Sequence, residues 1–244
     1  MPLGLGASLS KASIVTPGVV TDNLVMKHMY PAGAVQPISD GAAYFDVDVT
    51  DWIDVGNTPR LRTANFTNSA WVYFTSGIMG TGAGIITSIP GSSTKKGFSL
   101  IKHSDDTIIA RIGDGSNFDE TISPNDAVAN TWTHVAQTYD GTTQKLYIDG
   151  VLVDSDAYGT YVVSDDDFLI GAYYSSGALP MDGYICNVGY WSAALTEEQI
   201  KSIMWKQHAD LTTGTGSESE NLVSWWNLDT DANDSHGSNN GTLT

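Results

Sequence analysis

Asp-Gly pairs divide the middle of the chain into short segments. From about residue 40 to residue 190, apolar or alternating segments are separated by Asp114-Gly115, Asp140-Gly141, Asp149-Gly150 and Asp182-Gly183. Such pairs favour hairpin turns, because glycine accepts a positive φ and aspartate bonds its own backbone. Many short strands at this spacing predict an antiparallel sandwich or barrel. The clearest strand patterns cover residues 43–45, 66–74, 84–89, 98–101, 107–112, 131–139, 145–148, 168–172 and 183–191.

One helix and two distinct ends complete the predicted organisation. Residues 195–205 have an amphipathic pattern, and Thr196 precedes Gln199 at the spacing of a capping box. Residues 1–22 are rich in Gly, Ser, Thr and Pro, which is typical of an extended arm. The expected organisation is therefore an N-terminal anchoring arm over residues 1–22, a body over 23–206, and a linker with a C-terminal strand over 207–244 that packs on the body.

The composition argues against several classes of function. The 244 residues include 28 Asp and Glu, 11 Lys and Arg and one cysteine, with a net charge of −17. No nucleic-acid partner is expected, because phosphate binding uses clustered Lys and Arg. A lone cysteine forms neither an intrachain disulfide nor a multi-cysteine metal site. We also expect no transmembrane segment and no secretion signal, because the apolar runs are short and the first one is interrupted by Gly4, Gly6 and Ser8.

The strongest resemblance lies in one hairpin. Residues 130–141 read NTWTHVAQTYDG, and residues 145–153 read KLYIDGVLV. This hairpin resembles the signature hairpin of laminin-G-like and pentraxin-like jelly rolls, in the concanavalin A-like lectin/glucanase superfamily. Residues 42–55, 66–72 and 182–205 agree with the same pattern in the same order. The resemblance implies an all-β, two-sheet antiparallel jelly-roll sandwich with one short helix near 195–205.

The two ends resemble structural proteins of tailed bacteriophages, particularly marine ones. The similarity lies in the opening MPLGLGASLSK with TPGVVTDNLV and in the ending NLVSWWNLD. It implies a non-enzymatic virion surface protein, assembled in the host cytoplasm, that decorates the capsid or else the tail. Its expected partners are the major capsid protein or other virion proteins, held through the arm, host surface glycans, and further copies of itself in a homo-oligomer. The alternative is a lectin-like adhesion module of a cellular or viral surface.

No catalytic residue is predicted. Retaining glycosidases of this fold use two carboxylates about 5 to 5.5 Å apart, and the family carries them in the motif E-x-D-x-E or E-x-D-x-x-E. None of the five glutamates lies in such a motif: Glu120, Glu197, Glu198, Glu218 and Glu220. His134 and Cys186 lie in predicted strands and are expected to be buried. The other histidines lack the spacing of a zinc site.

Four aromatic residues are candidates for glycan binding. A sugar-binding site needs exposed rings beside short polar residues, because a ring stacks on the sugar and the polar groups bond its hydroxyls. Tyr173 and Tyr174 precede Ser175-Ser176-Gly177, and Trp225 and Trp226 precede Asn227. For the two tryptophans, anchoring of the tail to the body is the alternative.

Calcium is the candidate cofactor. Jelly rolls of this type carry calcium at loop rims, where oxygen ligands converge. Asp229, Asp231 and Asn233 alternate in one loop, but this loop lacks the glycine and glutamate of an EF-hand. Asp165 and Asp167 form a second candidate, for which a solvated loop is the alternative.

Overall fold

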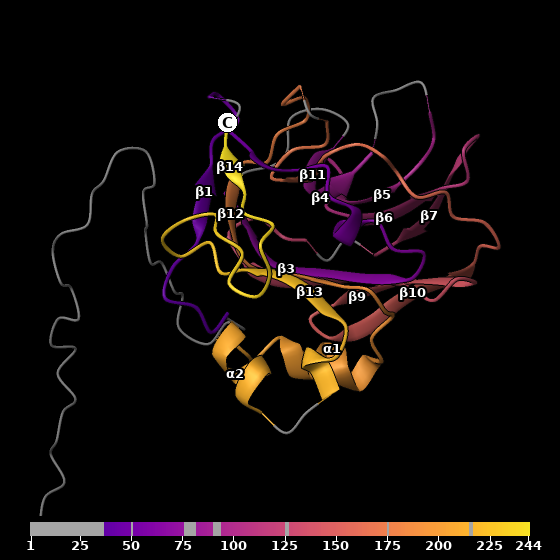
Figure 1. The fold of residues 1–244 in the computed structure, drawn as a ribbon. Coiled ribbons are helices and arrows are strands. Elements are labelled where there is room, and N and C mark those ends of the chain that lie inside the picture. The colour runs from indigo at the N-terminus through magenta and orange to yellow at the C-terminus, as the bar shows by residue number, and fades with distance from the viewer. Residues whose placement is uncertain are drawn as a thin grey trace, which may run out of the picture.

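Two stacked antiparallel sheets make up the architecture (Figure 1). The structure is a computed structural model and describes residues 37–49, 51–75, 82–89, 94–124, 127–174, 176–214 and 217–244. Each sheet has seven strands within these residues. The predicted all-β sandwich is therefore confirmed, whereas the proposed arm over residues 1–22 lies outside the described residues.

Sheet A contains the strands that carry the signature hairpin. Its order is β1-β12-β3-β8-β9-β10, and β13 also pairs with β12. The strands are β1 (Ala43–Phe45), β3 (Phe66–Phe74), β8 (Trp132–Tyr139), β9 (Thr143–Ile148), β10 (Val151–Ala157), β12 (Gly183–Trp191) and β13 (Leu222–Trp226). Because β13 pairs with β12, the C-terminal segment contributes to sheet A.

Sheet B has the order β14-β2-β11-β4-β5-β6-β7. Its strands are β2 (Ile53–Gly56), β4 (Ala83–Ser88), β5 (Phe98–Lys102), β6 (Ile108–Gly113), β7 (Phe118–Ile122), β11 (Phe168–Ile170) and β14 (Thr242–Leu243). The edge strand β14 pairs with β2, so the last residues of the chain belong to this sheet.

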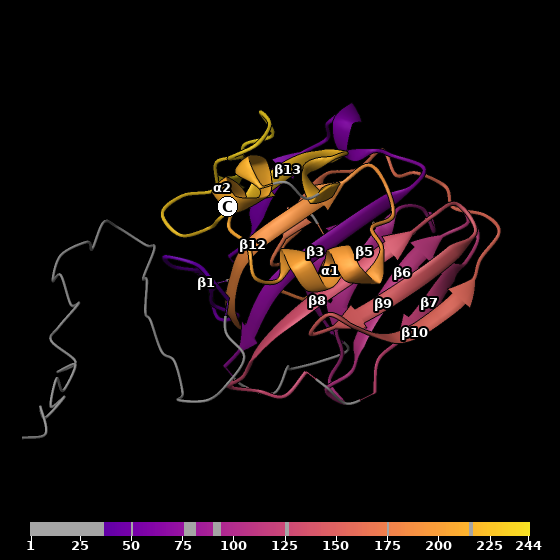
Figure 2. The ribbon, with the colours of Figure 1, turned by 90° about the horizontal axis from the view of Figure 1, so that it is seen from below.

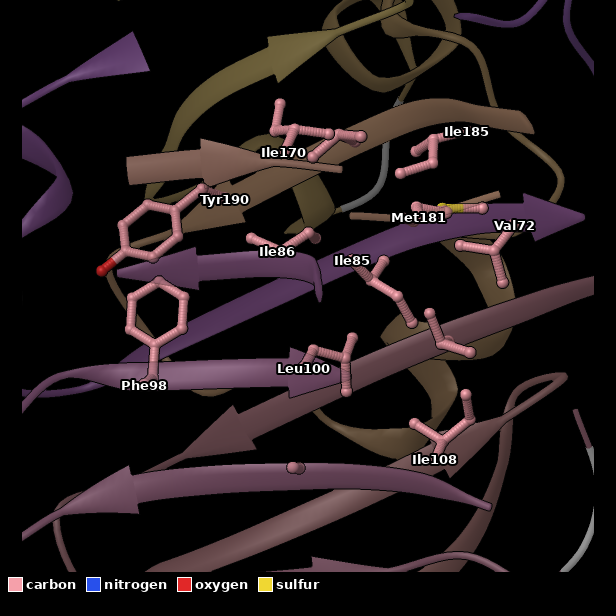
Figure 3. Close-up of a cluster of buried hydrophobic side chains, with 14 of the residues drawn as sticks. Val72, Ile85, Ile86, Phe98, Leu100, Ile108, Ile170, Met181, Ile185 and Tyr190 are labelled. Atoms are coloured by element: carbon pink, nitrogen blue, oxygen red, sulfur yellow. The ribbon is translucent and has the colours of Figure 1, made fainter. Parts of the chain in front are cut away.

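The main core lies between the two sheets. Figure 3 shows apolar side chains from both layers meeting there, including Leu100 and Ile108 from sheet B and Val72 and Ile185 from sheet A. Each of these four side chains is fully buried. Burial of one such side chain contributes about 1.5 to 3 kcal/mol. The alternation of apolar residues along β5 and β6 sends every second side chain into this core and leaves the others on the outer face of sheet B.

The outer face of sheet A is covered by helices. α1 (Glu197–Ile203) and α2 (His208–Thr213) lie on the side of sheet A that faces away from sheet B (Figure 1, Figure 2). Ile200 and Leu211 from these helices pack with Trp191 and Trp225 of sheet A. Short 3-10 turns lie at Pro59–Leu61 and Ser217–Ser219. No described helix is long and apolar enough to cross a membrane.

The helical segment differs in part from the expectation. α1 begins after Thr196, whose hydroxyl accepts a hydrogen bond from the Gln199 backbone N–H, so the predicted capping box is confirmed. The helix ends earlier than predicted, and α2 follows where the sequence suggested a linker. α2 is six residues long and ends in two threonines, so it has little helical signal of its own. It forms because Leu211 is buried against the body and because Asp210 accepts a hydrogen bond from the Gln207 backbone N–H at its start.

Candidate functional site

A pocket opens on the outer face of sheet B, the face opposite to the core. Its volume is about 310 Å³, and we call it the tyrosine pocket. Neighbouring strands bring its central residues together, because Arg111 on β6 lies opposite Glu120 on β7 and Gly113 lies opposite Phe118. The described residues that line it are Gly82, Lys95, Ile101, Arg111, Phe118, Glu120, Tyr173, Tyr174 and Leu179.

Close packing against β4 places the two tyrosines. They follow β11 in a segment that crosses the outer side of β4. The hydroxyl of Thr87 donates to the carbonyl oxygens of Ala172 and Tyr173, at 3.0 and 3.2 Å. Gly84 allows this approach, because a Cβ there would lie 2.1 Å from the carbonyl carbon of Ala172. These contacts hold Ala172 and Tyr173 against β4.

Arg111 is the best-fixed polar group in the pocket. Its Nε donates to Oε1 of Glu120 at 2.6 Å, and its Nη1 donates to the hydroxyl oxygen of Tyr173 at 3.1 Å. Burial lowers the pKa of Arg111, but Tyr173 and Glu120 outweigh this effect and raise the pKa above its ordinary value. The guanidinium thus stays charged and cannot rotate freely.

The two tyrosines have different roles in this geometry. Tyr173 is only 4% exposed, so it supports Arg111 and offers little surface to a ligand. Tyr174 is half-buried and packs edge-on against Tyr173, with ring centroids 4.4 Å apart. Phe118 is also half-buried, and the Nζ of Lys95 lies 5.0 Å from the centroid of its ring. Tyr174 and Phe118 therefore provide the accessible aromatic surface.

Two buried glutamines hold the strands beneath Arg111. Gln137 Nε2 donates to the Arg111 carbonyl at 3.0 Å and also to Gln144 Oε1. Gln144 Nε2 donates to the Ala110 carbonyl and to the hydroxyl of Thr121 on β7. Both glutamine side chains are fully buried. This network ties β8 and β9 of sheet A to the strands that carry Arg111 and Glu120.

The sequence indicated only part of the tyrosine pocket. Tyr173 and Tyr174 have the local signal of an aromatic pair beside short polar residues. Lys95, Arg111, Phe118 and Glu120 were missed, because they lie far from the tyrosines along the chain and come together only through strand register. The available signal was the position of Arg111 between the core residues Ala110 and Ile112 on β6, because alternation along a strand sends its side chain to the outer face.

Trp225 and Trp226 do not join the tyrosines. Both indoles are buried, with 1% and 0% exposure. Trp225 packs under the helices and its Nε1 donates to Oδ1 of Asn227, whereas Trp226 lies in the main core and its Nε1 donates to the Asn239 carbonyl. Neither ring has exposed surface on which a sugar could stack. Both tryptophans instead anchor the C-terminal segment to the body.

The calcium candidates are not gathered into a common site. Asp231 accepts hydrogen bonds from the backbone and side chain of Asn233, whereas Asp229 lines a separate pocket beside His208. Asp165 presents its backbone carbonyl to Asn57 and Arg62, and burial is the main cause that raises the pKa of Asp167. Calcium takes about six to eight oxygen ligands. No group of three or more His, Cys, Asp or Glu suited to a metal occurs among the described residues.

The structure also shows where His134, Cys186 and Glu120 lie. His134 and Cys186 are buried, as predicted, and Cys186 is a free thiol. Glu120 pairs with Arg111 and is the single carboxylate among the described residues that line the tyrosine pocket. The paired carboxylates of a retaining glycosidase are therefore not assembled by the lining residues of this pocket.

Comparison with known proteins agrees with the fold. Residues 47–201 match the family model of the concanavalin A-like lectin/glucanases superfamily. A candidate carbohydrate-binding protein from Bacteroides ovatus is similar in structure, with a TM-score of 0.61 and 22% identity over 83% of this chain and 57% of that chain. The CBM40 domain of a Ruminococcus gnavus sialidase bound to α2,3-sialyllactose has a TM-score of 0.54 and 13% identity over 71% of this chain and 100% of that chain. A search of curated proteins found no match. The chain belongs to the concanavalin A-like lectin/glucanases superfamily.

Proposed function

We propose that this chain is a carbohydrate-binding domain and that the tyrosine pocket binds the glycan. The observation that carries the proposal is the combination of accessible rings, Tyr174 and Phe118, with a guanidinium held in place by Glu120 and Tyr173. Rings of this kind stack on the apolar face of a sugar, and fixed polar groups bond its hydroxyls. The similar structures support the same proposal, because one is a candidate carbohydrate-binding protein from B. ovatus and the other is a domain of an R. gnavus sialidase bound to sialyllactose.

The charge of the tyrosine pocket favours an acidic glycan. Arg111 is balanced by Glu120, whereas Lys95 has no ion-pair partner among the described residues. The pocket is therefore net positive in a chain whose net charge is −17. A carboxylate or sulfate on the sugar would neutralise the positive charge of the tyrosine pocket. The attraction is stronger there than in water, because the pocket is partly desolvated.

Binding to an array of neutral and acidic glycans, followed by calorimetry, tests the proposal. We expect Tyr174→Ala to weaken binding at least about tenfold, which corresponds to about 1.4 kcal/mol. Lys95→Gln should weaken binding of acidic glycans and reduce its salt dependence. The matched controls on sheet A are Tyr184→Ala and Lys145→Gln, which should bind like the wild type. Absence of glycan binding by the wild type, or equal losses in the controls, would reject the tyrosine pocket.

We also propose that the domain acts on the surface of a bacteriophage particle, as a homo-oligomer attached to the major capsid protein or another virion protein. The support is the resemblance of the two ends of the sequence to phage structural proteins. Mass spectrometry of purified particles should find the protein, and deletion of residues 1–22 should abolish attachment while leaving the body folded. Absence from particles would instead favour the alternative, an adhesion module of a cell surface.

A further inference from the structure

A row of four aromatic side chains crosses the outer face of sheet A. Tyr44 on β1 lies opposite Tyr184 on β12, and Tyr184 lies opposite Tyr73 on β3. Tyr73 in turn lies opposite Trp132 on β8. The ring centroids of successive neighbours are 4.9, 5.8 and 5.6 Å apart. We call these four residues the aromatic row.

The aromatic row faces away from the main core. Phe45, Val72 and Ile185 each adjoin one of the three tyrosines in the chain, and all three are buried between the sheets. Alternation along each strand therefore sends the tyrosine side chains to the outer face of sheet A. The tyrosines are half-buried, and Trp132 is 8% exposed. The row thus offers a strip of ring surface across four strands.

The end of α1 borders the aromatic row. Trp71 lies two residues before Tyr73 on the same face of β3, and its Nε1 donates to the Met204 carbonyl at 3.0 Å. The next residue, Trp205, is 47% exposed, and its ring centroid lies 6.1 Å from that of Trp71. The accessible aromatic surface therefore extends from the row towards Trp205.

Carboxylates lie at the β1 end of the aromatic row. Asp46 directly follows β1, and Asp182 directly precedes β12. Burial, followed by the carboxylates of Asp46 and Asp182, raises the pKa of Tyr44. This end of the row therefore has a negative potential. Because cations are attracted both by such a potential and by the faces of aromatic rings, a positively charged group is favoured here.

The spacing of the aromatic row matches that of a polyproline II helix. Neighbouring strands lie about 4.7 to 4.9 Å apart, so every second space between the rings recurs at about 9.5 Å. A polyproline II helix rises about 3.1 Å per residue with three residues per turn, so prolines at i and i+3 recur at about 9.3 Å on one face. One proline would fit between Tyr44 and Tyr184, whose rings are inclined by 43°. The other would fit between Tyr73 and Trp132, inclined by 55°.

We propose that the aromatic row is a docking surface for a proline-rich segment of a partner protein, with prolines three residues apart and an arginine beside them. The prolines pack against the rings, and the arginine lies over Tyr44 beside Asp46. A polyproline II helix is formed before binding, so its docking costs little conformational entropy. The surface is separate from the tyrosine pocket, which lies on sheet B, and the proposal does not depend on glycan binding.

Binding of the full chain to an array of synthetic decapeptides tests the proposal. The peptides carry prolines at i and i+3, varied residues between them, and arginine, glutamine or glutamate at one end. We expect arginine-flanked peptides to bind, with an affinity that falls as the salt concentration rises. Peptides of the same composition with prolines at i and i+2 should bind at least about tenfold more weakly, because they do not match the spacing of the rings.

Substitutions separate the aromatic row from the tyrosine pocket. Tyr44→Leu and Tyr184→Ala should each weaken peptide binding at least about tenfold. Asp46→Asn should weaken binding of the arginine-flanked peptides and reduce its salt dependence. Its matched control is Asp156→Asn on β10, at the opposite edge of sheet A, which should bind these peptides like the wild type. Tyr174→Ala should lose glycan binding and retain peptide binding, so failure of one proposal is distinguishable from failure of the other.

Several outcomes would overturn the proposal. Circular dichroism and Tm establish that each variant is folded, and Tyr44→Phe, which keeps the ring, should retain peptide binding. If no arginine-flanked peptide binds the wild type at about 1 mM, the proposal is wrong. It is also wrong if folded Tyr44→Leu and Tyr184→Ala bind the peptides like the wild type, or if these variants lose binding to a neutral polysaccharide instead.

Discussion

Acidification should destabilise this fold through one buried histidine. His134 on β8 is 2% exposed, and its ring packs edge-on against Trp71 with centroids 5.4 Å apart. Its Nδ1 has no hydrogen-bond partner among the described residues. Burial lowers the pKa of His134 from 6.5 to about 3, because the interior disfavours the charged ring.

The sign and size of the effect follow from this shift. As pH falls below 6.5, the unfolded chain binds a proton at His134, while the folded chain does not until pH approaches about 3. The contribution of neutral His134 to the free energy of unfolding is therefore fully present above pH 6.5. It is lost as the pH falls from 6.5 towards about 3. Between pH 7 and pH 5 the loss amounts to about 2 kcal/mol, since one pKa unit corresponds to about 1.4 kcal/mol.

Urea unfolding of the wild type and of His134→Phe at both pH values measures this contribution. Phenylalanine keeps an aromatic ring against Trp71 but does not titrate. We expect the variant to lose about 2 kcal/mol less than the wild type on acidification, whatever its stability at neutral pH. His134→Gln provides a second non-titrating side chain. If both variants lose as much stability as the wild type between pH 7 and pH 5, burial of a neutral His134 is not the cause.

Two further substitutions test how the tyrosine pocket is built. Gly84→Ala should weaken glycan binding and lower Tm. The new Cβ would lie 2.1 Å from the Ala172 carbonyl carbon and would displace the segment that carries the tyrosines. Unchanged glycan affinity in the folded variant would contradict this packing. Gln144→Leu should cost about 1 to 3 kcal/mol in urea unfolding, because the Ala110 carbonyl and the Thr121 hydroxyl lose a buried donor. A loss below about 0.5 kcal/mol would show that this network contributes little to stability.

Elements with local signals were predictable from the sequence. Asp-Gly pairs and alternating side chains marked most strands, and the signature hairpin at 130–153 indicated the fold family that the family model confirms. The capping box of Thr196 and Gln199 was equally visible, because a helix start depends on residues three positions apart. α2 begins with a similar pair, Gln207 and Asp210, but it is short and also depends on burial of Leu211 against the body.

The candidate binding residues show the same difference between local and distant signals. Tyr173 and Tyr174 could be named from their neighbours in the sequence, but the sequence could not distinguish them from Trp225 and Trp226, which fold inward.

The sequence by itself determined the two-sheet sandwich, because strand periodicity, turn residues and helix caps act over a few positions. Only the tertiary structure decided which residues line the candidate binding site. Strand register places Arg111 beside Glu120, and it sets the four rings of the aromatic row side by side. Such contacts depend on the packing of segments that are distant in the chain, and no local pattern of residues records them.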